Sequence, residues 1–325
     1  MSLDWTPFVD LVRRHRSFLL TTHVRPDGDA LGSMLALADT LTSMGKTVHM
    51  TVASELPPRY DFLDPTHRVK RYSPPGNEYR GVEAVAVLDT GTWTQLGDFG
   101  DLLRTLQVPR IVIDHHLTQD DLGATRLVDT TAEATGRLIY EAILALGQKP
   151  SPAAAHSLFV ALAMDTGWFR HQNTRAATLE LAARLVEAGA RPTAAYEMLN
   201  EQGTLGRLRL VGLVLSRIQT ACDGKVCFTE LHRNDYEATG AVPQDSEDMI
   251  NYTRSVVGVQ VGLFFMEQPR GGVKVSFRSR EGVDVSRVAE QFGGGGHRLA
   301  SGATLDTSLE EAKRLVLAAI ASALP

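Results

Sequence analysis

The segment from residue 17 to residue 53 constrains the fold most strongly, because it carries a strand, a helix and a second strand in sequence. Residues 17–22 form an apolar run typical of a buried strand. Residues 30–44 place apolar side chains at helical spacing and end at Gly45, and residues 47–53 are again strand-like. Two strands joined by a helix normally lie parallel in one sheet. The segment therefore predicts the βαβ unit of an α/β fold.

The rest of the chain extends this pattern and then changes. Further strand-like runs at 82–88 and 110–113 favour a mostly parallel sheet flanked by helices. Glycine, proline and polar residues become frequent after the alanine-rich helix that begins near residue 174. Beyond them, hairpin-like strands mix with helices. We therefore expect a catalytic domain at 1–188, a linker at 189–206, and a smaller mixed α/β domain at 207–325 across a cleft.

Composition limits the class of protein. With 325 residues, 43% of them hydrophobic, the chain is long enough for two domains. No apolar run approaches the ~18 residues of a membrane span, and we see no secretory signal, so we expect a cytoplasmic protein without a membrane partner. The two cysteines, Cys222 and Cys227, are expected to be free thiols. A net charge of -5 argues against a protein that coats long duplex DNA.

Residues that bind metals follow three of the predicted strands. These are His23, Asp89 and the run Asp114-His115-His116. The carboxyl ends of strands in an open α/β sheet line one crevice, so these side chains are expected to converge. Asp27 and Asp29 lie in the turn after the first strand, at the same edge, and Asp165 ends a predicted helix. The sequence thus predicts one cluster of carboxylates and imidazoles.

Each of these residues also has a structural interpretation when it is considered alone. Asp27 or Asp29 could cap the following helix, and His23 could be an ordinary core histidine. The triplet Asp-Thr-Gly occurs twice, at 89–91 and 165–167, as it does in aspartic proteases. The predicted surroundings oppose that alternative, because aspartic proteases are secreted all-β duplications. The coincidence of so many ligand types at one sheet edge favours a metal site.

The chemistry of this cluster favours hard divalent ions. Carboxylate oxygens with a few imidazoles suit Mn²⁺ or Mg²⁺ better than Zn²⁺. Four aspartates, Asp27, Asp29, Asp89 and Asp165, would neutralise two divalent ions. A carboxylate can bridge two metals ~3.5 to 4 Å apart in a two-metal hydrolase site. We therefore expect two Mn²⁺ ions, with Mg²⁺ as the alternative.

Taken together, these motifs resemble the DHH phosphoesterase family. The resemblance rests on His23-x-x-Pro26-Asp27-x-Asp29, Asp89, Asp114-His115-His116 and Asp165, which occur in the family's order. Downstream, "SFRSR" at 276–280 and "GGGGHRLASG" at 293–302 are similar to the DHH-associated domain. The resemblance spans nearly the whole chain and is greatest to the stand-alone nanoRNase and pAp phosphatase subgroup.

The resemblance implies a role for each clustered residue. One Mn²⁺ would bind His23, Asp27 and Asp89, and a second would bind Asp29, Asp89, His115 and Asp165, so that Asp89 bridges the two. His116 would act catalytically beside the metals, by orienting a phosphate oxygen or supplying a proton. Asp114 would support a neighbouring histidine.

The second domain carries the expected substrate-binding residues. A run of glycines lets backbone N–H groups approach a phosphate closely, although such a run can equally be a flexible turn. Nearby basic residues favour a role in substrate binding. The expected substrate-binding residues are Arg278, Ser279, Arg280, Gly294, Gly295, Gly296 and His297, with Arg170 of the first domain as a lesser candidate.

The expected function is a manganese-dependent phosphoesterase with exonuclease activity. It would release mononucleotides from short RNA and AMP from 3'-phosphoadenosine 5'-phosphate (pAp), by attack of a metal-activated hydroxide. The enzymatic alternatives are a phosphodiesterase for cyclic di-AMP or its linear product pApA, and a polyphosphatase or pyrophosphatase. A nucleotide-sensing or RNA-binding module is the non-catalytic alternative. The sequence leaves a homodimer open.

Overall fold

The computed structural model describes residues 3–280 and 282–324. The chain divides into two compact units after Gln202, and each unit contains its own sheet. The division falls within the segment expected as a linker, 189–206. Much of that segment is helical, since helix α7 (Pro192–Asn200) belongs to the first unit.

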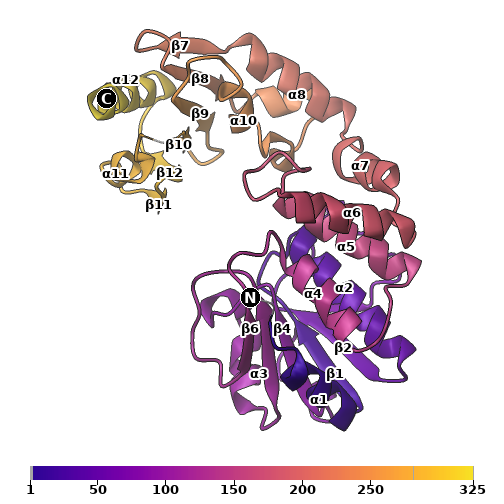
Figure 1. Ribbon diagram of the computed structural model, residues 1–325. Coiled ribbons are helices and arrows are strands. Elements are labelled where there is room, and N and C mark those ends of the chain that lie inside the picture. Colours follow the sequence, from indigo (N-terminus) through magenta and orange to yellow (C-terminus); the bar gives the residue numbers. More distant parts are fainter. Residues whose placement is uncertain (1–2, 281, 325) are drawn as a thin grey trace. The chain divides into compact units, whose positions relative to one another are not determined.

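The sheet of the first unit has six strands in the order β3-β2-β1-β4-β5-β6, and every pairing is parallel (Figure 1). This confirms the expected fold class. The strands are β1 (Ser17–Thr21), β2 (Thr47–Val52), β3 (Val69–Arg71), β4 (Ala84–Leu88), β5 (Arg110–Asp114) and β6 (Thr125–Val128). Strand β4 is buried along its whole length, as is typical of a central parallel strand.

Helices cover both faces of this sheet. One core joins the sheet to α1, α2, α4 and α5, and a second joins the opposite face to α3. The helices are α1 (Thr6–Arg14), α2 (Gly28–Ser43), α3 (Phe99–Thr105), α4 (Thr135–Ala145), α5 (Pro152–Asp165) and α6 (Ala176–Glu187). Helix α2 starts at the carboxyl edge of the sheet because Asp27 caps it, accepting hydrogen bonds from the N–H groups of Asp29 and Ala30.

Close packing of α2 on α5 fixes where the two helices end relative to the sheet. A Cβ on Gly32 would lie 2.3 Å from the carbonyl oxygen of Ser157, so only glycine allows the two backbones to approach this closely. This contact brings the N-terminus of α2 and the C-terminus of α5 to the same edge of the sheet. Asp29 and Asp165 are carried there with them.

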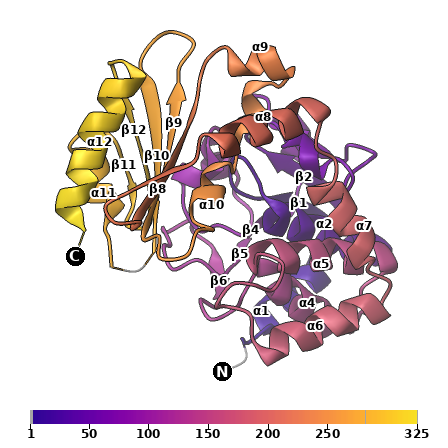
Figure 2. The same cartoon turned by 90° about the horizontal axis from the view of Figure 1, so that it is seen from above.

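The second unit is a mixed sheet in the order β11-β12-β10-β9-β8-β7, in which only β8 and β9 pair in parallel. The strands are β7 (Gln219–Ala221), β8 (Val226–Leu231), β9 (Val261–Glu267), β10 (Val273–Ser279), β11 (Gly295–His297) and β12 (Ala300–Leu305). The helices are α8 (Leu205–Ser216), α9 (Asp235–Thr239), α10 (Ile250–Thr253), α11 (Val285–Glu290) and α12 (Leu309–Ala323). Helices α11 and α12 pack on one face, and α8 and α10 pack on the other (Figure 2).

Two further findings concern the cysteines and the character of the helices. Cys222 and Cys227 are both free thiols. Within the described residues, none of the helices has the length and apolar character needed to cross a bilayer.

Candidate active site

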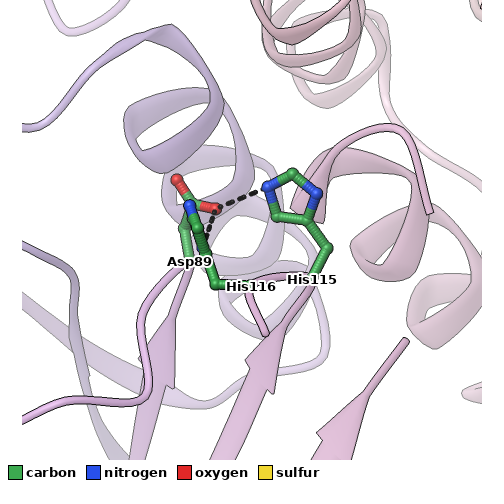
Figure 3. Close-up of side chains that lie close together, drawn as sticks. All are labelled: Asp89, His115 and His116. Atoms are coloured by element: carbon green, nitrogen blue, oxygen red, sulfur yellow. Dashed lines mark ion pairs between the residues drawn. The ribbon is translucent and has the colours of Figure 1, made fainter. Parts of the chain in front are cut away.

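The structure brings the predicted ligand residues together at the carboxyl edge of the parallel sheet. His23 follows β1, Asp89 follows β4, and His115 and His116 follow β5. Asp27 and Asp29 come from the start of α2, and Asp165 is the last residue of α5. Figure 3 shows the ion pairs that join the Asp89 carboxylate to His115 and His116.

A first group of donor atoms contains His23, Asp27 and Asp89. The Nε2 atom of His23 lies 3.5 Å from Oδ2 of Asp89 and 4.0 Å from Oδ1 of Asp27. The three donor atoms lie within 4.8 Å of one another, which is a spacing that one metal ion can span. The group matches the first ligand set that the family resemblance implies.

A second group surrounds His115. Its Nε2 atom lies 3.3 Å from Oδ2 of Asp165, 3.6 Å from Oδ1 of Asp89 and 3.8 Å from Oδ2 of Asp29. The two groups share Asp89, whose Oδ2 faces His23 while its Oδ1 faces His115. A carboxylate with one oxygen towards each group has the geometry of a bridging ligand.

Hydrogen bonds at Nδ1 orient the histidines. The Nδ1 atoms of His23 and His115 lie 2.9 Å and 3.2 Å from the carbonyl oxygens of Val24 and Ala132. When Nδ1 donates to a carbonyl, the other ring nitrogen is left free to act as a ligand. The Nε2 atoms of both rings therefore face the carboxylates as metal-binding nitrogens would.

His116 lies at the exposed side of the cluster, with 54% of its side chain accessible. Its Nδ1 atom is 2.8 Å from Oδ1 of Asp114 and 3.8 Å from Oδ1 of Asp89. The hydrogen bond to Asp114 and the nearby carboxylates outweigh burial and raise the pKa of His116 to about 9. The imidazole is therefore protonated at neutral pH in the metal-free chain.

Asp114 is buried and holds the two histidines that follow β5. Its Oδ1 accepts hydrogen bonds from the N–H groups of His115 and His116, and its Oδ2 accepts one from Nε2 of Gln119. Burial alone would raise the pKa of Asp114, but the hydrogen bonds from His116 and Gln119 hold it below its ordinary value. The carboxylate therefore stays ionised and fixes the His116 ring.

The remaining carboxylates repel one another. Burial is the main cause that raises the pKa of Asp29 and of Asp89 well above the ordinary value, and neighbouring aspartates add to it. Burial likewise raises the pKa of Asp165. Buried acids in mutual contact are costly unless a cation compensates their charge. The donor types, their spacing and this excess of negative charge all fit divalent metal ions.

The N-terminus of α4 completes the site, and the sequence did not predict it. The N–H groups of Thr135 and Gly136 donate to Asp29 at 2.6 Å and 2.8 Å, and Thr135 Oγ1 donates to Asp89 at 2.8 Å. A further hydrogen bond reaches Asp29 from Ser33 Oγ. These donors hold the two most buried carboxylates among the proposed metal ligands. The only local signal in the sequence is the Thr-Gly pair at 135–136.

Two structural alternatives can now be judged. Asp27 does cap α2, and the same carboxylate lies in the first group of donor atoms, so its capping role does not exclude a ligand role. Asp89 and Asp165, the first residues of the two Asp-Thr-Gly triplets, do converge. They lie on a parallel sheet and a helix rather than in two β-sheet halves, so the fold excludes the aspartic protease architecture.

In the second unit, Arg278 and His297 are cross-strand neighbours of the same residue. Arg278 of β10 and His297 of β11 both pair with Ala300 of β12, so their side chains share a face. Glycine is required nearby for packing, because a Cβ on Gly294 would lie 2.2 Å from the carbonyl oxygen of Gly302 and one on Gly296 2.7 Å from that of Ala300. The side chains of Arg278 and His297, and the backbone at Gly295, remain at least partly accessible.

Three other expected substrate-binding residues are engaged within the fold. Ser279 is buried and its hydroxyl donates to the carbonyl of Val283. The guanidinium of Arg280 donates to the carbonyl of Arg254, and that of Arg170 to the carbonyl of Gly167. Both arginines are exposed and keep further donors, whereas the Ser279 hydroxyl has no access to a ligand.

Comparison with known proteins covers both units. Residues 17–164 match the model of the N-terminal domain of the DHH family, and residues 223–324 match that of the DHHA1 domain. The bifunctional oligoribonuclease and PAP phosphatase NrnA of Thermus thermophilus is 33% identical over 306 residues, which cover 93% of this chain and 88% of that protein. The protein of the same name from Bacillus subtilis is 27% identical over 317 residues, 96% of each chain.

A solved structure supports the same fold. An exopolyphosphatase-related protein from Bacteroides fragilis matches with a TM-score of 0.88, over 98% of this chain and 95% of that one. The two sequences are 24% identical, so this likeness bears on the fold alone.

Proposed function

The chain belongs to the DHH family of phosphoester hydrolases, and we propose that it is a manganese-dependent enzyme acting on short oligoribonucleotides and on pAp. The observation that carries the proposal is the convergence of two ligand groups that share Asp89. The names of relatives that are 27% to 33% identical over nearly the whole chain supply the two substrate classes.

We assign the ligands as follows. His23, Asp27 and Asp89 would hold one Mn²⁺, and Asp29, Asp89, His115 and Asp165 would hold the other. When bound, two such ions supply a nucleophile at neutral pH and neutralise charge on the phosphoryl oxygens. Asp29 and Asp89 are preorganised for this role by the hydrogen bonds from Thr135 and Gly136.

His116 is the proposed proton donor. It is held by Asp114 and is half exposed at the edge of the ligand groups. A protonated imidazole in this place can hydrogen-bond a phosphoryl oxygen and protonate the leaving oxygen of a nucleotide. Asp114 keeps the ring in the orientation that this requires.

The second unit is the proposed substrate-binding domain. Arg278 and His297, with the exposed residues Gly295 and Gly296 beside them, can hold the phosphate or nucleobase that is not cleaved. A net charge of -5 leaves little attraction for a long nucleic acid. Local recognition of this kind favours short substrates.

A parallel turnover assay tests the proposal. Purified protein would be incubated with pAp, diribonucleotides, pApA, cyclic di-AMP and pyrophosphate, each with Mn²⁺, with Mg²⁺ and with excess EDTA. We expect AMP from pAp and mononucleotides from diribonucleotides with Mn²⁺, and no turnover with EDTA. Preferred turnover of pyrophosphate or cyclic di-AMP would reassign the substrate, and full activity in EDTA would reject the metal centre. Binding of nucleotides without turnover would identify a sensor.

A further inference from the structure

The turn that follows Asp165 has an unusual backbone. Gly167, Trp168 and Phe169 are consecutive residues with φ values of 55°, 56° and 62°. The left-handed region suits glycine, but it is unfavourable for bulky aromatic residues. Such a conformation persists only where its surroundings enforce it.

Aromatic packing within the first unit enforces this turn. The Trp168 ring lies edge-on against Tyr196 of α7, with centroids 4.9 Å apart, and 6.3 Å from Phe159 of α5. Phe169 packs against the same Phe159 ring, with centroids 6.0 Å apart. The Trp168 N–H also donates to the carbonyl of Ala163 at 2.6 Å. We call Phe159, Trp168, Phe169 and Tyr196 the aromatic cluster.

The position of the Asp165 carboxylate depends on the backbone more than that of any other proposed carboxylate ligand of the second ion. Asp29 is held by three hydrogen bonds, and Asp89 by Thr135 Oγ1. Among the residues that the structure describes, no hydrogen-bond donor is found for the Asp165 carboxylate, whose nearest charged contact is His115 Nε2 at 3.3 Å. Its side chain is also 28% exposed, compared with 1% for Asp29.

The backbone of Asp165 is in turn fixed by the segment that the aromatic cluster holds. Asn173 Nδ2 lies 3.2 Å from the carbonyl oxygens of both Asp165 and Glu133, so it ties the end of α5 to the loop before α4. Residues 167–169 lie within the segment that connects Asp165 to Asn173. A change in the turn would therefore be transmitted directly to the Asp165 carboxylate.

We propose that Trp168 and Tyr196 are a positioning pair, which holds Asp165 in place for the second metal ion. The inference rests on the proposed metal centre. It adds a role for α7, the last helix of the first unit, which is thereby tied to a metal ligand through one ring contact. A displacement of α7 would weaken the metal site.

Calorimetric titration with Mn²⁺ tests the pair. Removal of a group that supports a metal ligand typically costs 10–100-fold in affinity, and Tyr196→Ala should lie near the lower end, about tenfold, at one of two sites. Tyr196→Phe keeps the ring and should retain the affinity of the unmodified chain. Phe62→Ala is the matched control, because Phe62 makes an edge contact with His156, at 6.3 Å, elsewhere in the same unit. It should leave Mn²⁺ binding unchanged.

Each outcome separates the alternatives. Tyr196 is 44% exposed, so its truncation should leave the chain folded, which circular dichroism at the titration temperature would verify. Tyr196→Leu, which keeps apolar bulk but lacks a ring, is expected to bind as weakly as Tyr196→Ala. Equal Mn²⁺ affinity in Tyr196→Ala and the unmodified chain would overturn the positioning role and leave the metal centre standing. An unmodified chain that binds no Mn²⁺ would overturn both.

Discussion

At the residue scale, Asp89 is the proposed ligand that the two groups of donor atoms share. The sequence placed it at a strand end beside the other ligands, and the structure shows one oxygen towards each ligand group. Its left-handed backbone, with φ of 58°, could not be read from the sequence, although aspartate tolerates this region better than most residues. Replacement of this side chain would leave His23 and His115 with no shared carboxylate.

Replacement of Asp89 and replacement of His116 should therefore have different effects. We expect Asp89→Ala to abolish turnover and to weaken binding of both ions, because it removes the shared ligand. His116→Ala should keep most of the bound metal while kcat falls about 10²–10⁴-fold, the usual contribution of a general acid. Metal content measured beside kcat distinguishes the two. Equal metal loss in both variants would show that these roles are wrongly assigned.

Arg278 and His297 should matter for recognition rather than for metal binding. Loss of a hydrogen bond from a charged group costs roughly 1.5–3 kcal/mol, or about 10–150-fold in KM. We expect Arg278→Ala and His297→Ala to raise KM for pAp and diribonucleotides by such factors, but to leave a small artificial phosphodiester nearly unaffected. Lys274→Ala, an exposed change at the opposite end of β10, is the control. Equal losses for both kinds of substrate would point to a role in folding or catalysis.

At the element scale, hydrophobic periodicity predicted β1, β2, β4, β5 and α2 to within a few residues at each end, whereas β3, β6, α1 and α3 were not predicted. Helix α4 shows why such small differences matter. The helix begins at Thr135, so the N–H groups of Thr135 and Gly136 are the free donors that reach Asp29, and a small shift of this start would change which donors face the site. Asp29 lies more than a hundred residues earlier, and no local pattern encodes that contact.

Gly136→Ala tests the fit of α4 against the site. An added Cβ would lie 2.6 Å from Cβ of Ala161 and 3.4 Å from Oδ1 of Asp29, so the helix has to shift. We expect a loss of about 1–3 kcal/mol in stability, the usual range for overpacking, together with weaker Mn²⁺ binding. Gly212→Ala is the matched control in α8, where an added Cβ meets nothing within 4 Å, and it should stabilise its helix by roughly 0.5–1 kcal/mol. Thermal unfolding and metal titration measure both. An unchanged melting temperature for Gly136→Ala would contradict the packing argument.

At the scale of the whole molecule, the topology of the sheet makes the site predictable in kind. Parallel strands deliver their carboxyl ends to one edge, so residues as distant as His23 and His115 could be grouped from the predicted strand ends. The supporting contacts were not predictable, because they depend on side-chain packing. Thr135, Gln119 and Tyr196 gave no motif, and the Ser279 hydroxyl proved to be used within the fold.

The charge of the cluster should also link metal binding to the stability of the whole chain. In the metal-free protein, the folded pKa of Asp29 and of Asp89 is raised above the unfolded value of about 3.9, so the folded state binds more protons between those two pKa values. Stability contributed by these groups therefore falls as pH rises through that window. His116 acts in the same direction, because its folded pKa of about 9 exceeds the unfolded value of about 6.5, and its contribution is lost as pH rises towards 9. A divalent ion removes the repulsion.

We expect the melting temperature in EDTA to decrease from pH 5 to pH 8, and Mg²⁺ or Mn²⁺ to raise it most at pH 8. Free metal at about 100 times its dissociation constant would add ~2.7 kcal/mol to the stability of the folded state. Asp29→Asn keeps the shape of the side chain but removes one buried charge, so its melting temperature in EDTA should change less with pH. Thermal unfolding of both proteins across this pH range, with and without metal, measures the difference. Parallel pH profiles in EDTA would show that the repulsion among these carboxylates does not limit the stability of the metal-free chain.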